Sequence, residues 1–201
     1  MEYIEYAEAR DAAWEVLIAC KANQLPVNLN TVLRCLRVNA YPYSRNQVAL
    51  EALGLAKAAS KTSGLTFYRG LTPVILYDDN ESPQRIRFTV AHELGHIVLG
   101  HIRPGEFTIQ NREPRAKDDP IEQAANRFAV DLLAPACVLW GLGVRGPDDI
   151  IRICGISAKA ALYRAQRMEL LYRRNRFLSH PLERAVYQQF YPYIKECLDR
   201  D

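Results

Sequence analysis

Two histidines and a glutamate stand together in the middle of the chain, in the run HELGH over residues 92–96. If this run is helical, His92 and His96 lie one turn apart on the same face. Imidazoles placed in this way can both bind one Zn²⁺ at about 2.0–2.1 Å. Glu93 can then accept a proton from a zinc-bound water, whose pKa the metal lowers from about 15.7 to about 7. The run therefore predicts a hydrolase, although a helix with two surface histidines is the simpler alternative.

The helix that must carry these residues has a start signal and a stop signal in the sequence. Ser82 is a favourable N-cap, and Pro83 suits the first helical position, where no backbone N–H is needed. Gly100 suits the left-handed conformation in which many helices end. On the face opposite the histidines, apolar residues recur at helical spacing: Ile86, Val90, Leu94, Ile97 and Val98. We expect this face to pack in a core and the two imidazoles to point away from it.

A zinc site needs at least one further protein ligand. Two other histidines are present, His101 and His180, but neither lies on a well-placed helix. Glu122 is the stronger candidate, because it lies on a helix expected over 121–133. The alternative is that Glu122 only completes a capping box with Asp119, three residues earlier.

For other polar residues near this site the sequence leaves alternative roles open. Asn126 follows Glu122 by one helical turn, so its amide oxygen could accept the second ring N–H of a ligating histidine; an ordinary surface asparagine is the alternative. We place His101 and Tyr77 in the candidate cleft, although His101 could simply pack at the helix end. The donor that would stabilise the oxyanion of the reaction stays open between Tyr68, Tyr77, His101 and the arginines.

Further helices are expected from apolar periodicity in other parts of the chain. They cover residues 3–22, 31–37, 47–59 and 181–197. Asn30 would cap the second of these helices. Pro192 should kink or break the last one, because proline lacks the backbone N–H that the preceding turn requires.

Extended segments are expected between the N-terminal helices and the histidine helix. Two short runs rich in β-branched and aromatic residues, 65–69 and 73–77, predict a small sheet. Residues 41–43 should be extended, because the residue before a proline avoids the helical region. After the histidine helix, a long polar loop with a strand over 106–110 is expected.

The C-terminal part has the pattern of two helices joined by a tight turn, over 148–154 and 158–171. Lys159, Arg164 and Arg167 lie on the second of these helices, and they could contact nucleic acid or a protein partner if they are exposed. The formal net charge of only +3 favours the alternative, a packing unit whose arginines are solvated.

The composition limits the class of protein. The chain has 201 residues, of which 49% are hydrophobic and 24% charged, as in an ordinary globular protein. Its five cysteines lack C-x-x-C spacing, which favours reduced thiols in the cytoplasm over a disulfide framework. No signal peptide or membrane span is expected, because acidic residues open the chain and its apolar runs are short.

Two stretches of the chain together resemble the ImmA/IrrE family of metallopeptidases. The first covers residues 85–101 around HELGH, and the second is EQAANRFAVDLLAP over 122–135. The resemblance implies a gluzincin-like site in which His92, His96 and Glu122 bind zinc and Glu93 is the catalytic acid and base. It also implies a protein substrate, a helix-turn-helix repressor from a bacterium or phage, and a small helix-turn-helix-like unit after the peptidase domain.

We therefore predict an α+β protein with a mainly helical, zincin-like peptidase domain and a small β-sheet over 1–140. A helix-turn-helix-like C-terminal unit follows over 141–201. The expected function is that of a cytoplasmic endopeptidase with one Zn²⁺ per chain, which cuts a repressor of a phage, mobile element or stress regulon. The alternative is a DNA- or protein-binding regulator with a structural or vestigial metal site, in which residues 148–176 make the contacts.

Overall fold

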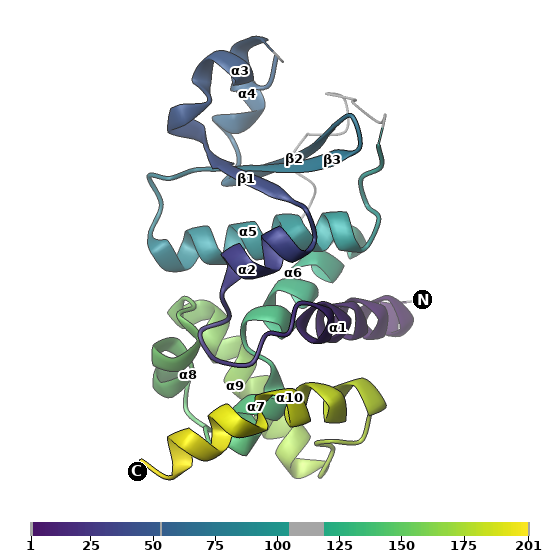
Figure 1. Cartoon of the computed structure of the whole chain (residues 1–201), viewed down its shortest axis with the longest axis vertical. Helices are drawn as coiled ribbons and strands as arrows, with labels where there is room; N and C mark the ends of the chain where they lie inside the picture. The colour runs from purple at the N-terminus through teal and green to yellow at the C-terminus, as the bar shows by residue number, and fades with distance from the viewer. Residues whose placement is uncertain (1, 53, 105–118, 201) are drawn as a thin grey trace.

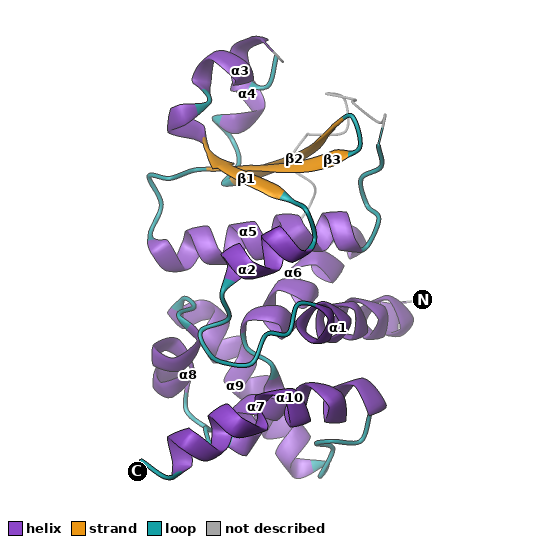
Figure 2. Cartoon of the chain, in the orientation of Figure 1, coloured by secondary structure: helices purple, strands orange, loops and turns teal. Residues whose placement is uncertain are grey.

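The computed structural model of the protein describes residues 2–52, 54–104 and 119–200. Within these ranges the chain is mainly helical and contains one small sheet (Figures 1 and 2). The α+β class predicted from the sequence is therefore confirmed. The strand expected over 106–110 lies outside the described residues.

The sheet consists of β1 (Asn39–Pro42), β2 (Gly64–Arg69) and β3 (Thr72–Tyr77), in the order β1-β3-β2. The two runs predicted as strands form an antiparallel hairpin, whose turn contains Gly70 with a φ of 63°. β1 pairs with β3 in parallel, so two of the three residues expected to be extended, Tyr41 and Pro42, belong to the sheet. Tyr43 instead begins a short 3-10 helix, η1 (Tyr43–Arg45). Among the described residues β2 is an edge strand of this sheet, and it lies beside the histidine helix.

Two helices follow the capping signals in the sequence closely. α5 (Pro83–Val98) begins after Ser82, whose side chain accepts a hydrogen bond from the Arg85 N–H. α6 (Pro120–Leu133) begins after Asp119, whose carboxylate accepts from the Ile121 N–H. In Figure 1 the sheet covers one side of α5, and α6 and α1 (Glu2–Ala19) lie on its other side.

The remaining N-terminal helices differ in detail from the expected ones. α2 (Leu29–Cys35) is capped by Asn28, which accepts from the Thr31 N–H, and not by Asn30 as predicted. The single helix expected over 47–59 is wrong, because the chain forms α3 (Gln47–Ala52) and α4 (Ala56–Ala59). Gly54 separates them with a φ of 66°, a conformation that interrupts a right-handed helix.

The C-terminal part contains α7 (Ala136–Gly141), α8 (Pro147–Cys154), α9 (Ala158–Arg173) and α10 (Pro181–Leu198). α8 and α9 are joined by the expected tight turn, with Gly155 left-handed and Ser157 as the N-cap of α9. The break expected at Pro192 is wrong, because α10 continues through it. Pro192 and Gln188 are both exposed, so water can reach the backbone carbonyl that proline leaves without its helical partner.

The larger hydrophobic core draws buried residues from α1, α5, α6 and all four C-terminal helices. A smaller core lies between the sheet and the short helices α3 and α4. The division into units at residue 140 stays a prediction. Across the described ranges, none of the helices combines the length and the apolar character that crossing a bilayer requires.

Candidate metal centre

A close approach of two helices brings the site together. His92 and His96 lie on α5, and Glu122 lies on the first turn of α6. The helices can pack closely because α5 has Gly95 at their contact. A Cβ added there would lie 3.1 Å from Phe128 Cδ1 and 3.2 Å from Ala125 Cα, which is tighter than ordinary contacts. The glycine between the two histidines therefore helps to bring Glu122 within reach of them.

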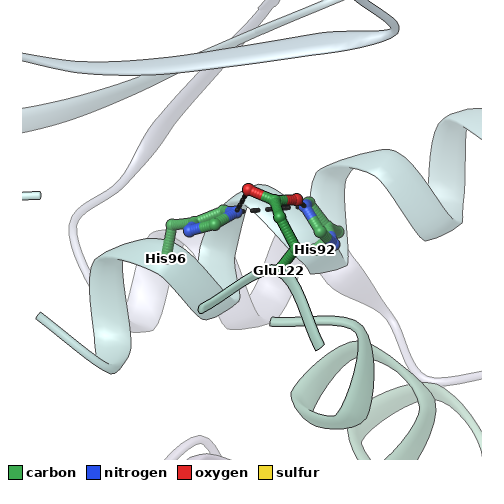
Figure 3. Close-up of side chains that lie close together, drawn as sticks. All are labelled: His92, His96 and Glu122. Atoms are coloured by element: carbon green, nitrogen blue, oxygen red, sulfur yellow. Dashed lines mark hydrogen bonds and ion pairs between the residues drawn. The ribbon is translucent and has the colours of Figure 1, made fainter. Parts of the chain in front are cut away.

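Three side chains converge on one point, as Figure 3 shows. His92 Nε2 and His96 Nε2 are 3.0 Å apart, and the Glu122 carboxylate oxygens lie 3.2 Å from His92 Nε2 and 3.5 Å from His96 Nε2. Tetrahedral ligands held at about 2.0–2.1 Å from Zn²⁺ are separated from one another by about 3.3 Å. The donor set and its spacing therefore fit a zinc ion, and these residues could hold one.

The capping-box alternative for Glu122 does not account for this geometry. The Asp119 Oδ1 accepts the Ile121 N–H at 2.9 Å, a capping bond that does not require Glu122. The Glu122 carboxylate lies against both imidazoles, a contact that a capping box does not require. The alternative of two surface histidines also fails, because His96 is only 8% exposed beneath the neighbouring elements.

The second ring nitrogen of each histidine has a partner of its own. His92 Nδ1 lies 3.0 Å from Asn126 Oδ1, so Nδ1–H can donate to the amide oxygen and leave the Nε2 lone pair for a metal. The sequence left this contact open, with an ordinary surface asparagine as the alternative. His96 Nδ1 lies 3.1 Å from His101 Nδ1. His101 therefore packs at the end of α5 against His96, which the sequence left open.

The carboxylates around the site favour a positive charge within it. Burial alone would lower the pKa of His92, but the hydrogen bond that its ring donates to Glu122 and the charges of Glu93 and Glu122 outweigh burial and raise that pKa. The same negative field would attract a divalent cation to the two imidazoles.

Glu93 forms a hydrogen bond with a residue of the sheet that the sequence analysis missed. Thr66 Oγ1, on β2, lies 2.5 Å from Glu93 Oε2. Two residues earlier on the same strand, Gly64 lies directly against the Glu93 side chain. The period-two alternation of β2 places these residues on one face, but the strand predicted over 65–69 did not include Gly64, and no local pattern shows that this face meets Glu93. Tyr77, the other candidate cleft residue, pairs with Gly64 at the end of β3 and is partly exposed.

The basic residues of α9 differ in exposure, and Arg164 fits neither the contact surface nor the solvated arginines that the sequence analysis considered. Arg164 is 2% exposed, and its Nη2 lies 2.6 Å from Asp131 Oδ1. Its predicted contact with nucleic acid or a partner is therefore wrong, because α9 turns this side chain toward α6. Arg167 is partly buried, and Lys159 is exposed. Contact through these two residues stays a prediction.

Comparison with known families supports the chemistry suggested by this geometry. The Peptidase_M78 family model, described as an IrrE N-terminal-like domain, matches residues 35–166. The match covers about two thirds of the chain, including the sheet, α5 and α6. No curated protein matches the chain.

Proposed function

This chain belongs to the IrrE N-terminal-like family of peptidases, and on that basis we propose that it is a zinc-dependent endopeptidase. The family is one of zinc metallopeptidases and implies a protein substrate. The observation that supports the proposal most directly is the convergence of His92 Nε2, His96 Nε2 and the Glu122 carboxylate on one point.

In this proposal each residue has a defined part. His92, His96 and Glu122 would hold the zinc, which when bound supplies a Lewis acid and a water of low pKa. Glu93 accepts a proton from the attacking water and passes it to the leaving amine. Asn126 fixes the His92 ring so that Nε2 faces inward.

The substrate would be an extended segment of a protein. β2 is an edge strand of the described sheet, and it passes directly beside Glu93. A peptide added to such an edge gains main-chain hydrogen bonds without any requirement on its sequence. The finer proposal, a cytoplasmic helix-turn-helix repressor of a phage, mobile element or stress regulon, rests on the family resemblance.

The variant Glu93→Gln tests the proposal, because it keeps the shape of the side chain but cannot accept a proton at neutral pH. We expect it to retain one zinc per chain by elemental analysis and to lose cleavage of a repressor encoded beside the protein. His96→Ala should lose both zinc and cleavage. Full activity of Glu93→Gln would remove Glu93 from the mechanism.

The alternative of a DNA- or protein-binding regulator with a structural or vestigial metal site has less support. It relied on exposed basic residues of α9, and Arg164 is buried in an ion pair. A salt-sensitive gel shift that is lost in Lys159→Ala, with repression intact in Glu93→Gln, would favour this alternative over the peptidase.

A further inference from the structure

One face of β2 contacts the Glu93 side chain at two neighbouring positions, Gly64 and Thr66. Thr66 is 2% exposed, and its hydroxyl lies 2.5 Å from Glu93 Oε2. An ionised carboxylate can only accept hydrogen bonds, so the threonine hydroxyl must be the donor. Hydrogen bonds to a charged acceptor are about twice as strong as those between neutral groups.

Gly64 provides the space for this contact. A Cβ added at residue 64 would lie 2.6 Å from Thr89 Cγ2, 2.9 Å from Glu93 Cγ and 3.0 Å from Glu93 Oε1. Such distances require the neighbours to move, and Thr89 is a stiff, β-branched residue inside α5. The backbone of β2 therefore lies closer to Glu93 than any residue with a side chain at position 64 would allow.

We propose that Thr66 is a positioning residue that fixes the Glu93 carboxylate, and that Gly64 permits the close approach this requires. The inference rests on the proposed function, since it concerns the group that would move the proton. A glutamate side chain has several rotatable bonds, and a general base must lie within about 2.6–3.2 Å of the heavy atom whose proton it accepts. Threonine is restricted at χ1 and stands on a strand of the sheet, so its hydroxyl is a rigid anchor.

The two oxygens of the Glu93 carboxylate have different neighbours. Thr66 engages Oε2, and the other oxygen, Oε1, lies on the side of Gly64. Loss of the Thr66 hydroxyl would let the Glu93 carboxylate rotate. The substitution would leave His92, His96 and Glu122 unchanged. We therefore expect Thr66 to affect the rate of the chemical step and neither zinc affinity nor substrate binding.

The test compares Thr66→Val, which removes the hydroxyl at nearly constant shape, with Thr66→Ser, which keeps it. Thr72→Val is the matched control, because Thr72 is on β3 at the turn end of the same hairpin. In the full-length, zinc-loaded protein we expect Thr66→Val to lower kcat about 10- to 100-fold, with KM within about twofold of the wild type. Thr66→Ser should recover kcat to within about threefold, and Thr72→Val should match the wild type.

Two readouts do not depend on turnover. Competition with a chromophoric chelator should give the same zinc affinity for Thr66→Val and the wild type. In the zinc-free protein, Thr66→Val should lower the urea midpoint in the wild-type background but not in the Glu93→Ala background, where the hydroxyl has lost its acceptor.

A second substitution addresses the same contact through Gly64. Gly64→Ala should displace the Glu93 side chain and lower kcat while zinc stays bound. Gly146→Ala is its control, because a Cβ at Gly146 meets nothing within 4 Å and its φ of −89° suits alanine. This pair of variants keeps the test decisive if Thr66→Val folds poorly.

The outcomes separate this inference from the proposed function. If the wild type cleaves its substrate and Thr66→Val keeps its kcat, or Thr66→Ser is as slow as Thr66→Val, the positioning role is wrong and the peptidase assignment stands. Equal shifts of the urea midpoint in both backgrounds would likewise overturn it. If the zinc-loaded wild type cleaves no repressor or peptide, the proposed function fails and this inference fails with it.

Discussion

The Nδ1 atoms of the two imidazoles in the site have different hydrogen-bond partners. His92 donates to the amide oxygen of Asn126, whereas His96 faces another imidazole, that of His101. An amide oxygen can only accept, so Asn126 fixes the proton of His92 on Nδ1. The orientation and tautomer of His92 are therefore set by α6, the same helix that carries Glu122.

We expect Asn126→Ala to weaken zinc binding about 10- to 100-fold, because the ring of His92 loses the partner that orients it. Alanine is a good helix former, so α6 should be unchanged. The affinity can be measured by competition with a chromophoric chelator. Asn30→Ala, an exposed asparagine on α2, is the control and should leave the affinity unchanged. Equal affinities in all three proteins would contradict the role of Asn126.

The variant Glu122→Gln can distinguish the role of Glu122 as a zinc ligand from its alternative role in a capping box. Glutamine supports a capping box as glutamate does, so Glu122→Gln should preserve α6 if capping is its role. If its carboxylate binds zinc, the same variant should lose more affinity than the roughly 10- to 100-fold expected of an outer partner. Zinc titration distinguishes the two roles, and circular dichroism checks that α6 is intact in the variant. Wild-type zinc affinity in Glu122→Gln would count against a ligand.

Between elements, a buried ion pair joins α6 to α9. Asp131 is buried, and it accepts hydrogen bonds from Arg127 on its own helix and from Arg164 on α9. Burial raises the pKa of Asp131, but the charges of the two arginines outweigh burial and lower it. The contribution to stability is therefore complete above pH 3.8, the ordinary pKa, and is lost as the pH falls through the lowered pKa.

We expect Arg164→Met to lower the free energy of unfolding by about 3–5 kcal/mol, because it leaves the charge of Asp131 buried with one partner fewer. Arg173→Met is the matched control on the same helix. Its ion pair with Glu169 is exposed, so its loss should cost about 0–1 kcal/mol. Urea denaturation of the zinc-free proteins measures both values. Similar costs for the two variants would show that the α6–α9 contact adds little.

The ends of α5 and α6 could be predicted because the signals for them are local. Ser82 and Asp119 each cap a backbone N–H within three residues, and such contacts depend little on the rest of the fold. The spacing of His92 and His96 is likewise a property of one helix. For this reason the sequence analysis found both motif helices, and the three side chains that it named on them converge in the structure. Their role as zinc ligands stays a prediction.

Contacts between distant segments could not be predicted in the same way. The burial of Arg164 depends on Asp131, 33 residues earlier, and the hydrogen bond from Thr66 to Glu93 spans 27 residues. The local rule for Pro192 was overridden because that part of α10 is exposed to water. In each case the sequence shows the residue type, and only the packing of other elements determines its environment.

Taken as a whole, the molecule stacks the sheet, α5, α6 with α1, and the C-terminal helices along its longest axis (Figure 1). The candidate metal centre lies where the second and third of these layers meet, and β2 reaches it from the first. A ligand that binds there contacts residues of two helices that the unfolded chain does not hold together. Its binding free energy therefore adds to the stability of the whole fold.

Zinc should accordingly raise the melting temperature of the protein. At a free zinc concentration 100 times the Kd, the stabilisation is about 2.7 kcal/mol. For a chain of this size, each kcal/mol shifts Tm by about 2–4 °C, so we expect a rise of about 5–11 °C that chelation reverses. His96→Ala should show no such rise. His180→Asn, which replaces a histidine at the N-cap of α10 by a good capping residue, should keep it. Calorimetry with and without zinc measures these shifts, and an equal rise in His96→Ala would place the ion at another site on the molecule.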